Sequence, residues 1–148
     1  MKKLLKILTL SLVVMALVVG CSGGKETPQT PEEIAEAEYQ AFEEQAVETA
    51  KEFVLATQGD KEKIKELSFP SLLEDIEAKN WSIMLVDEIR IDAETLETTI
   101  EKMGDRQVFV RVFYEGEMDV DGDIIPVKLS NKLGVIKQDD KALVFIVE

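Results

Sequence analysis

Apolar residues recur at spacings of three and four along residues 31–58, which predicts one long amphipathic helix. We expect it to begin at Thr30-Pro31-Glu32-Glu33, where a capping hydroxyl precedes a proline at the first helical position and a glutamate follows three residues after the cap. Gly59 should end it. The stripe that should face the core consists of Tyr39, Phe42, Ala46, Ala50, Phe53 and Thr57.

Two shorter helices should follow. Asp60 can cap a helix over residues 61–67, with Ile64 and Leu67 facing inward. Phe69-Pro70 should break that helix, because the residue before a proline avoids helical geometry. Ser71-Leu72-Leu73-Glu74 has the form of a second capping box and predicts a helix running to about Lys79.

After Trp81 the period of the apolar positions changes from 3.6 to 2, which predicts strands. Residues 83–91 alternate and are interpreted as a strand. Residues 94–103 are ambiguous, because their aliphatic spacing fits a helix while their three threonines favour a strand; we predict a strand.

Residues 107–115 form the clearest strand. Val108, Val110, Val112 and Tyr114 share one face while Phe109 and Phe113 share the other, so we expect a central strand covered on both sides. Further strands are predicted over 127–135 and 143–147, with turns at 104–105 and 139–140. The predicted fold class is α+β, with a long N-terminal helix and two short helices packed on a curved antiparallel sheet.

The first 20 residues have a different pattern, typical of a secretory signal. Lys2, Lys3 and Lys6 precede residues 7–19, which are nearly all apolar. This run is too short to span a bilayer comfortably, since a helix needs about 20 residues for roughly 30 Å of hydrocarbon. The small residue Gly20 comes directly before Cys21, as a cleaving peptidase requires.

Leu17-Val18-Val19-Gly20-Cys21 resembles the lipobox of bacterial lipoproteins. The resemblance implies diacylglyceryl transfer to the Cys21 sulfur, cleavage between Gly20 and Cys21, and attachment to the outward side of a bacterial cell membrane through that lipid. An ordinary secretory signal with a stray thiol and an uncleaved short anchor are the alternatives. An intrachain disulfide is excluded, because Cys21 is the only cysteine.

These features predict three parts: a signal peptide over residues 1–20, a lipidated flexible linker over 21–30, and a single α+β domain over 31–148. The linker sequence SGGKETPQT has the glycine, serine and proline content of a flexible tether. Fully extended, its nine residues reach roughly 30 Å, enough to hold the domain clear of the lipid headgroups.

The charge of the mature part limits its partners. Lys2, Lys3 and Lys6 leave with the signal, so 30 acidic residues face 14 basic ones, a formal charge of −16. Such a surface should repel nucleic acid and anionic headgroups. We therefore expect no nucleic-acid partner, and a neutral or cationic ligand should bind in preference to an anionic one.

The run Phe53-Val54-Leu55-Ala56-Thr57-Gln58-Gly59-Asp60, followed by KEKIKELS and then by a predicted sheet, resembles the nuclear-transport-factor-like or ketosteroid-isomerase-like superfamily. The resemblance covers roughly residues 32–148. It implies a cone-shaped, cystatin-like fold with a pocket between the curved sheet and the long helix. The superfamily includes enzymes, transport factors and binding modules, so the fold does not settle the function.

The chain offers little catalytic chemistry. It has no histidine, no free thiol once Cys21 carries lipid, and no glycine-rich phosphate loop. Only carboxylates, Tyr39 and Tyr114 could act in a pocket, and both tyrosines fit apolar stripes typical of a core. We therefore assign no catalytic residue and no cofactor.

Carboxylates occupy every second position from Glu115 to Asp123 in EGEMDVDGD. On a continuous strand they would share one face and could hold Ca²⁺. The spacing does not match an EF-hand, because counting from Asp119 places Gly122 fourth and Ser130 where the closing glutamate belongs. Asp121-Gly122 also favours a hairpin that would divide the row, so we predict a solvated acidic turn and no metal site.

Two functions remain open at this point. The first is a non-catalytic module that binds a small ligand, a peptide or an envelope protein. The second is an isomerase-like or dehydratase-like enzyme that uses a pocket carboxylate and a tyrosine. A buried carboxylate within hydrogen-bond reach of a tyrosine in an open pocket would favour the enzyme, whereas a cone filled by side chains would favour a scaffold or interaction role.

Overall fold

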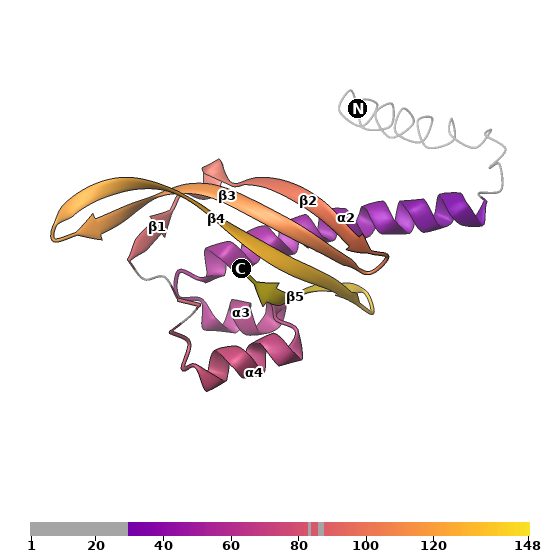
Figure 1. Ribbon diagram of the computed structural model, residues 1–148, viewed down its shortest axis with the longest axis horizontal. Helices are drawn as coiled ribbons and strands as arrows, with labels where there is room; N and C mark the ends of the chain where they lie inside the picture. The colour runs from indigo at the N-terminus through magenta and orange to yellow at the C-terminus, as the bar shows by residue number, and fades with distance from the viewer. Residues whose placement is uncertain (1–29, 83, 86–87) are drawn as a thin grey trace, which may run out of the picture. The chain divides into compact units, whose positions relative to one another are not determined.

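The computed structural model describes residues 30–82, 84–85 and 88–148 (Figure 1). The chain divides into two compact units, residues 1–34 and 35–148. Within the described residues the predicted α+β class is confirmed. The helices are α2 (Pro31–Ala56), α3 (Lys61–Leu67) and α4 (Pro70–Ala78), and the strands are β1 (Ile89–Ile91), β2 (Glu97–Gly104), β3 (Gln107–Val120), β4 (Asp123–Gln138) and β5 (Lys141–Val147), with a 3₁₀ turn η1 (Ala93–Thr95) before β2.

The predicted capping box at the start of α2 is confirmed. The Thr30 backbone N–H donates to a Glu33 carboxylate oxygen at 2.7 Å, and the Glu33 N–H donates to the Thr30 hydroxyl oxygen at 3.3 Å. At the other end the last helical residue is Ala56, and a turn leads to Gly59, whose φ of +115° a residue with a side chain rarely adopts.

The predicted apolar stripe of α2 faces the core. Phe42, Ala46, Ala50 and Phe53 are buried, and Tyr39 and Thr57 at its two ends are half-buried. The helix is tied to the sheet by polar contacts as well. The Gln45 amide donates to the Asp140 carbonyl at 3.1 Å, and the Gln58 amide donates to the Ile89 carbonyl at 2.9 Å.

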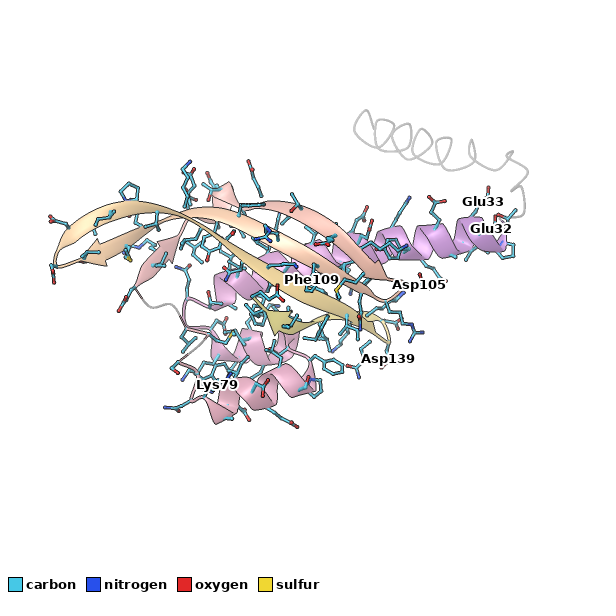
Figure 2. All side chains as sticks on the ribbon, in the orientation of Figure 1. Glu32, Glu33, Lys79, Asp105, Phe109 and Asp139 are labelled. Carbon is cyan, nitrogen blue, oxygen red and sulfur yellow. The ribbon has the colours of Figure 1, made fainter. Side chains whose placement is uncertain are left out.

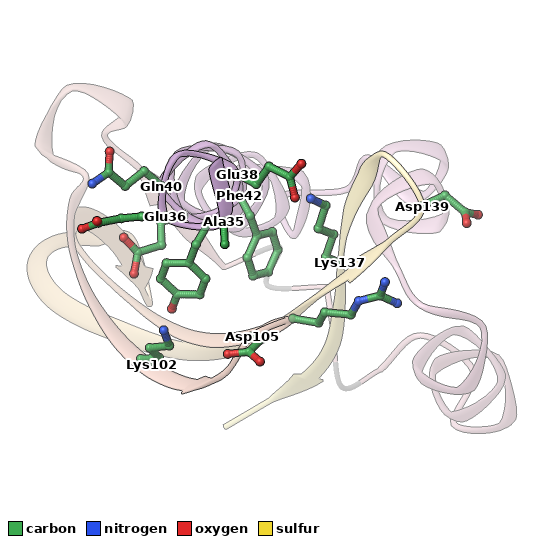
Figure 3. A pocket seen from close by; sticks show the side chains of 12 residues that line it. Ala35, Glu36, Glu38, Gln40, Phe42, Lys102, Asp105, Lys137 and Asp139 are labelled. Atoms are coloured by element: carbon green, nitrogen blue, oxygen red, sulfur yellow. The ribbon is translucent and has the colours of Figure 1, made fainter. Parts of the chain in front are cut away.

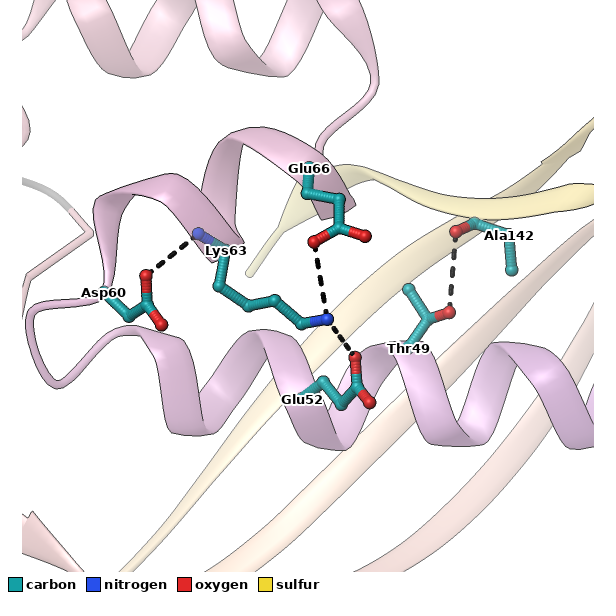
Figure 4. Close-up of polar contacts among 6 residues, drawn as sticks. All are labelled: Thr49, Glu52, Asp60, Lys63, Glu66 and Ala142. Carbon is teal, nitrogen blue, oxygen red and sulfur yellow. Dashed lines mark hydrogen bonds and ion pairs between the residues drawn. The ribbon is translucent and has the colours of Figure 1, made fainter.

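Helix α3 begins as predicted. The Lys63 backbone N–H donates to the Asp60 carboxylate at 3.0 Å, and Ile64 and Leu67 are buried. Figure 4 shows the Lys63 ammonium between two carboxylates, Glu52 of α2 at 2.9 Å and Glu66 at 3.5 Å. All three side chains are substantially exposed, so this network orients α3 on α2 more than it stabilises the fold.

The predicted capping box at Ser71–Glu74 is wrong. Helix α4 begins at Pro70, and its N-cap is Phe69, two residues before the predicted cap at Ser71; Phe69 makes no side-chain capping bond. The reason is tertiary. The Phe69 N–H donates to the Val144 carbonyl of β5 at 2.7 Å, which fixes the backbone before the helix, and proline at the first helical position needs no N–H partner.

The five strands form one antiparallel sheet in which β3 is central. Strand β4 pairs with the whole length of β3, and β5 pairs with the end of β4. On the other side of β3, two strands follow one another: β2 lies opposite residues 107–113 and β1 opposite residues 116–118. Figure 1 shows the β3–β4 ribbon twisting past α2, with α3 and α4 below β5 in that view.

The core lies between the helices and one face of this sheet, called here the inner face. Val108, Val110 and Val112 of β3 are fully buried, together with Leu133 and Val135 of β4. They belong to one cluster with side chains from all three described helices, including Phe42, Phe53, Ile64 and Ile76. Burial of side chains of this size contributes about 1.5–3 kcal/mol each, so this cluster dominates the stability.

Two predictions about the strands are wrong. The first is that β3 is covered on both faces. Strand β3 is central, but the three described helices contribute to the core on the inner face, and Phe113 on the outer face is 41% exposed. Phe109, also on the outer face, is half-buried, with Lys132 Nζ 3.8 Å from its ring centroid.

The second wrong prediction is the strand over residues 83–91. Of its described residues only Ile89–Ile91 are a strand, while Met84 and Glu88 lie in turns and Met84 is buried. Helix α4 ends in a reversal: Asn80 and Trp81 have φ of 53° and 66°, and the Trp81 N–H donates to the Ile76 carbonyl at 3.0 Å. The ambiguous residues 94–103 divide into η1 and β2, which confirms a strand there from Glu97.

Candidate functional site

The predicted turns at 104–105 and 139–140 lie at one end of the sheet. Figure 2 shows Asp105, in the β2–β3 turn, and Asp139, in the β4–β5 turn, at the same end of the strands. Consecutive antiparallel strands require this, because every second turn of a meander falls at the same end. Residues at both turns line one cleft together with residues of α2 from Ala35 onward.

A cleft of about 820 Å³ opens between α2 and these two turns (Figure 3). A volume of this size is within the usual range for ligand sites, roughly 300–1,000 Å³. Five carboxylates and three basic groups give the cleft a mixed and slightly acidic character. The residues that line it are Ala35, Glu36, Glu38, Tyr39, Gln40, Phe42 and Glu43 of α2, and Lys102, Asp105, Arg106, Lys137 and Asp139 of the sheet and its turns.

Tyr39 is the central aromatic residue of the cleft. Its ring meets the buried ring of Phe42 edge to face, with 6.3 Å between the ring centroids. The hydroxyl oxygen is fully buried, and no group in the described part of the chain makes a hydrogen bond of regular geometry with it, although the Glu43 carboxylate lies close enough to interact with it. Burial raises the pKa of Tyr39, and the nearby carboxylates of Glu43 and Asp105 act in the same direction, so the neutral phenol is favoured.

The ammonium group of Lys102 lies over the Tyr39 ring, with Nζ 3.8 Å from the ring centroid. Such a cation–π contact is worth about 0.5–1 kcal/mol at an exposed site. Among the described residues no carboxylate lies within ion-pair distance of this ammonium. Figure 3 shows Lys102 and Asp105 across from α2, on the side of the cleft away from Lys137.

Behind the cleft, apolar side chains occupy the space between α2 and the sheet. Phe53, Val110 and Leu133 belong to the core cluster there and are at most 1% exposed. Thr49 and Ser68 are the only buried polar residues in the part of the chain that the structure describes, and no Asp or Glu there is buried. Where the structure describes the chain, the interior therefore lacks a desolvated carboxylate that could act as a general base.

Tyr114 lies in the inner face of the sheet, as its apolar stripe predicted. It is 8% exposed, and its hydroxyl donates to the Asn131 side-chain oxygen of β4 at 2.6 Å. Burial raises the pKa of Tyr114. Unlike Tyr39, this tyrosine has a satisfied hydroxyl, and its role is to join β3 to β4.

The row of carboxylates in EGEMDVDGD is divided by a hairpin. Asp121 and Gly122 form the two-residue connection between β3 and β4, with φ of 56° and 92°, the positive values that this tight turn requires. The Gly122 N–H donates to the Asp119 carboxylate at 2.8 Å, and Glu115 forms an ion pair with Lys128 across the strands. Within the described residues, no three potential metal-ligating side chains converge.

The predicted lipid attachment and cleavage site, Gly20 and Cys21, lies outside the described residues, as does most of the predicted linker. None of the helices in the described ranges is long and apolar enough to cross a membrane.

Tyr39 and Phe42 of the cleft belong to the predicted stripe of α2, but no apolar pattern in the sequence indicated its charged groups. Lys102, Asp105 and Arg106 lie at the β2–β3 turn, and Lys137 and Asp139 lie at the β4–β5 turn. A signal was present, because both turns were predicted and a meander brings them to one end of the sheet. The distance from that end to α2 depends on packing, which the local pattern does not contain.

Two comparisons with known proteins bear on the identity of the chain: no family model matches it, and no curated protein does.

Proposed function

We propose that this protein is a lipid-anchored module on the outward face of a bacterial cell membrane, which binds a small ligand, a peptide or an envelope protein without catalysing a reaction. The proposal rests on the arrangement of the domain. Its described interior is filled by apolar side chains, and its polar groups line an open cleft between α2 and the sheet. Binding needs such a cleft, whereas general base catalysis also needs a positioned and tuned base.

The location follows from the lipobox at Cys21 and the short apolar run before it. Two or three acyl chains on one cysteine anchor a protein durably, because each buried methylene contributes about 0.8 kcal/mol. The order of a long helix, two short helices and an antiparallel sheet supports the resemblance to the nuclear-transport-factor-like superfamily, whose members include binding modules.

Anchoring is tested by metabolic labelling with a clickable fatty acid in cells that express the full chain. The wild type should carry the label and Cys21→Ala should lose it, while both are produced in similar amounts. Ser22→Ala, which leaves the cysteine in place, is the matched control and should stay labelled. Equal labelling of wild type and Cys21→Ala would exclude the lipid anchor.

Binding is tested by a thermal-shift screen of the detergent-solubilised full chain against small metabolites and peptides. A ligand that binds only the folded state raises the unfolding midpoint. The shift should disappear in Tyr39→Leu, which alters the cleft, and persist in Phe113→Leu, which alters the outer face. A ligand that raises the unfolding midpoints of both variants equally would mean that the binding site lies outside the cleft.

An isomerase-like or dehydratase-like enzyme is the second candidate, and Tyr39 beside Glu43 is the observation that favours it. A neutral tyrosine with a buried, unpartnered hydroxyl can donate a hydrogen bond to a developing oxyanion. Turnover of a carbonyl substrate that Tyr39→Phe and Glu43→Gln both abolish, with binding retained, would favour this enzyme over the binding module.

A further inference from the structure

The ammonium of Lys102 occupies a position in the cleft that an external cation could take. It lies on the face of the Tyr39 ring, at 3.8 Å from the centroid, and among the described residues it has no ion-pair partner. Lys102 itself is exposed and comes from β2 at the point where the regular register ends, between Lys102 and Gly104. The side chain can therefore leave the ring at the cost of one weak contact.

The surroundings of the ring suit a positive charge. Glu43 and Asp105 are close enough to act on the Tyr39 hydroxyl, and that hydroxyl has lone pairs that no described group uses. An ammonium at this position would contact the aromatic face, while the two carboxylates and the hydroxyl would act on it from beyond ion-pair and hydrogen-bond distance, as they do on Lys102. The basic residue Lys137 lies on the opposite side of the cleft, as Figure 3 shows.

We propose that the Tyr39 end of the cleft binds the ammonium group of a lysine side chain from a peptide, and that Lys102 is the intramolecular occupant which this lysine displaces. A peptide is favoured over a free amine because a cleft of about 820 Å³ is far larger than one ammonium requires, and Glu36 and Glu38 add further carboxylates along α2. The acidic mature chain favours the approach of a basic peptide. This inference rests on the proposed binding function and specifies its ligand class.

The experiment is a calorimetric titration of the full chain, in uncharged detergent micelles, with acetyl-trilysine amide. Removal of the competing Lys102 ammonium should tighten binding in Lys102→Gln by about two- to fivefold, the factor that a cation–π contact corresponds to. Lys79→Gln makes the same change in net charge at the C-cap of α4, and its affinity should equal that of the wild type. Tyr39→Leu should weaken binding by about two- to fivefold.

Three results would overturn the inference: no binding of the trilysine peptide to any variant, equal affinities for Lys102→Gln and Lys79→Gln, or wild-type affinity in Tyr39→Leu. If Tyr39→Leu does not fold, the comparison of the two lysine variants decides alone. Putrescine in place of the peptide separates the two sources of an ammonium group, and equal binding of both would overturn the assignment to a peptide. An uncharged ligand that binds the cleft while trilysine does not would overturn this inference and leave the proposed binding function intact.

Discussion

The two tyrosines of the domain should respond in opposite directions to the same substitution. Tyr39→Phe removes a hydroxyl that is fully buried and has no hydrogen-bond partner among the described residues. Tyr114→Phe removes a hydroxyl that donates to Asn131 at 2.6 Å. Both variants keep the aromatic ring and its packing, so the difference between them isolates the hydroxyl groups.

The magnitudes follow from the cost of burying polar groups. A buried polar group without a partner costs about 1–3 kcal/mol, so Tyr39→Phe should raise the free energy of unfolding by about 1 kcal/mol, or about 4 °C in midpoint for a domain of this size. A satisfied hydrogen bond contributes about 1 kcal/mol, and Tyr114→Phe should lower the free energy of unfolding by about that amount.

The pH dependence of the free energy of unfolding provides a second test of the Tyr39 hydroxyl. The pKa of Tyr39 is raised by burial, so above pH 10 the unfolded chain releases a proton that the folded chain retains. The free energy of unfolding of the wild type therefore falls as pH rises through that range. Tyr39→Phe lacks the titrating hydroxyl, so the difference between its free energy of unfolding and that of the wild type should grow between pH 9 and pH 10.5.

The assay is urea unfolding followed by far-ultraviolet circular dichroism, for the wild type and both variants at pH 7 and at the two alkaline values. Equal destabilisation by Tyr39→Phe and Tyr114→Phe at pH 7 would refute the reasoning, because it would mean that the Tyr39 hydroxyl has a partner in the folded protein. An advantage of Tyr39→Phe that shrinks at alkaline pH would refute the raised pKa of Tyr39 in the folded protein.

Three further predictions concern the sheet, the end of α4 and the acidic turn. Gly134→Ala should lower the free energy of unfolding, measured in urea, by about 1–3 kcal/mol, because an added Cβ would collide with Ile146. Gly104→Ala, with open space around the added Cβ, should change the free energy of unfolding little. Equal effects of the two substitutions would contradict this prediction. Asn80→Gly should raise the free energy of unfolding by about 0.5 kcal/mol, because the φ of 53° at this position suits glycine. A lowered free energy of unfolding would contradict the left-handed end of α4. Calcium titration should show only weak, millimolar-type binding, and a saturable micromolar site lost in Asp121→Asn would overturn the division of the acidic row.

Local sequence patterns predicted two helix starts and a hairpin correctly, because the residue types there have one dominant structural role. The Thr30–Glu33 capping box, the Asp60 cap and the Asp121-Gly122 hairpin are all present, since each depends on hydrogen bonds within a few residues of sequence. The inner face of β3 was likewise predictable, because apolar residues occupy every second position from Val108 to Tyr114.

Tertiary contacts determined what the sequence did not indicate. The start of α4 depends on the bond from Phe69 to Val144, which lies 75 residues away in sequence. The position of the short β1 depends on β2, because β2 occupies residues 107–113 of β3 and β1 pairs beyond them, with residues 116–118. The cleft could be predicted only in part, because Tyr39 belongs to a helical pattern while the sheet residues of the cleft lie in two turns or at the strand ends beside them, with no pattern of their own.

The central claim is that the cleft beside Tyr39 is where this protein meets its ligand. A photo-crosslinking amino acid introduced at Gln40, inside the cleft, and at Glu74, on exposed α4, tests it directly in cells that express the full chain. The account predicts a discrete adduct from position 40, identified by mass spectrometry, that is absent from position 74 and diminished when Tyr39→Leu is added. The same adducts from both positions, or none from position 40 alongside a discrete one from position 74, would contradict it.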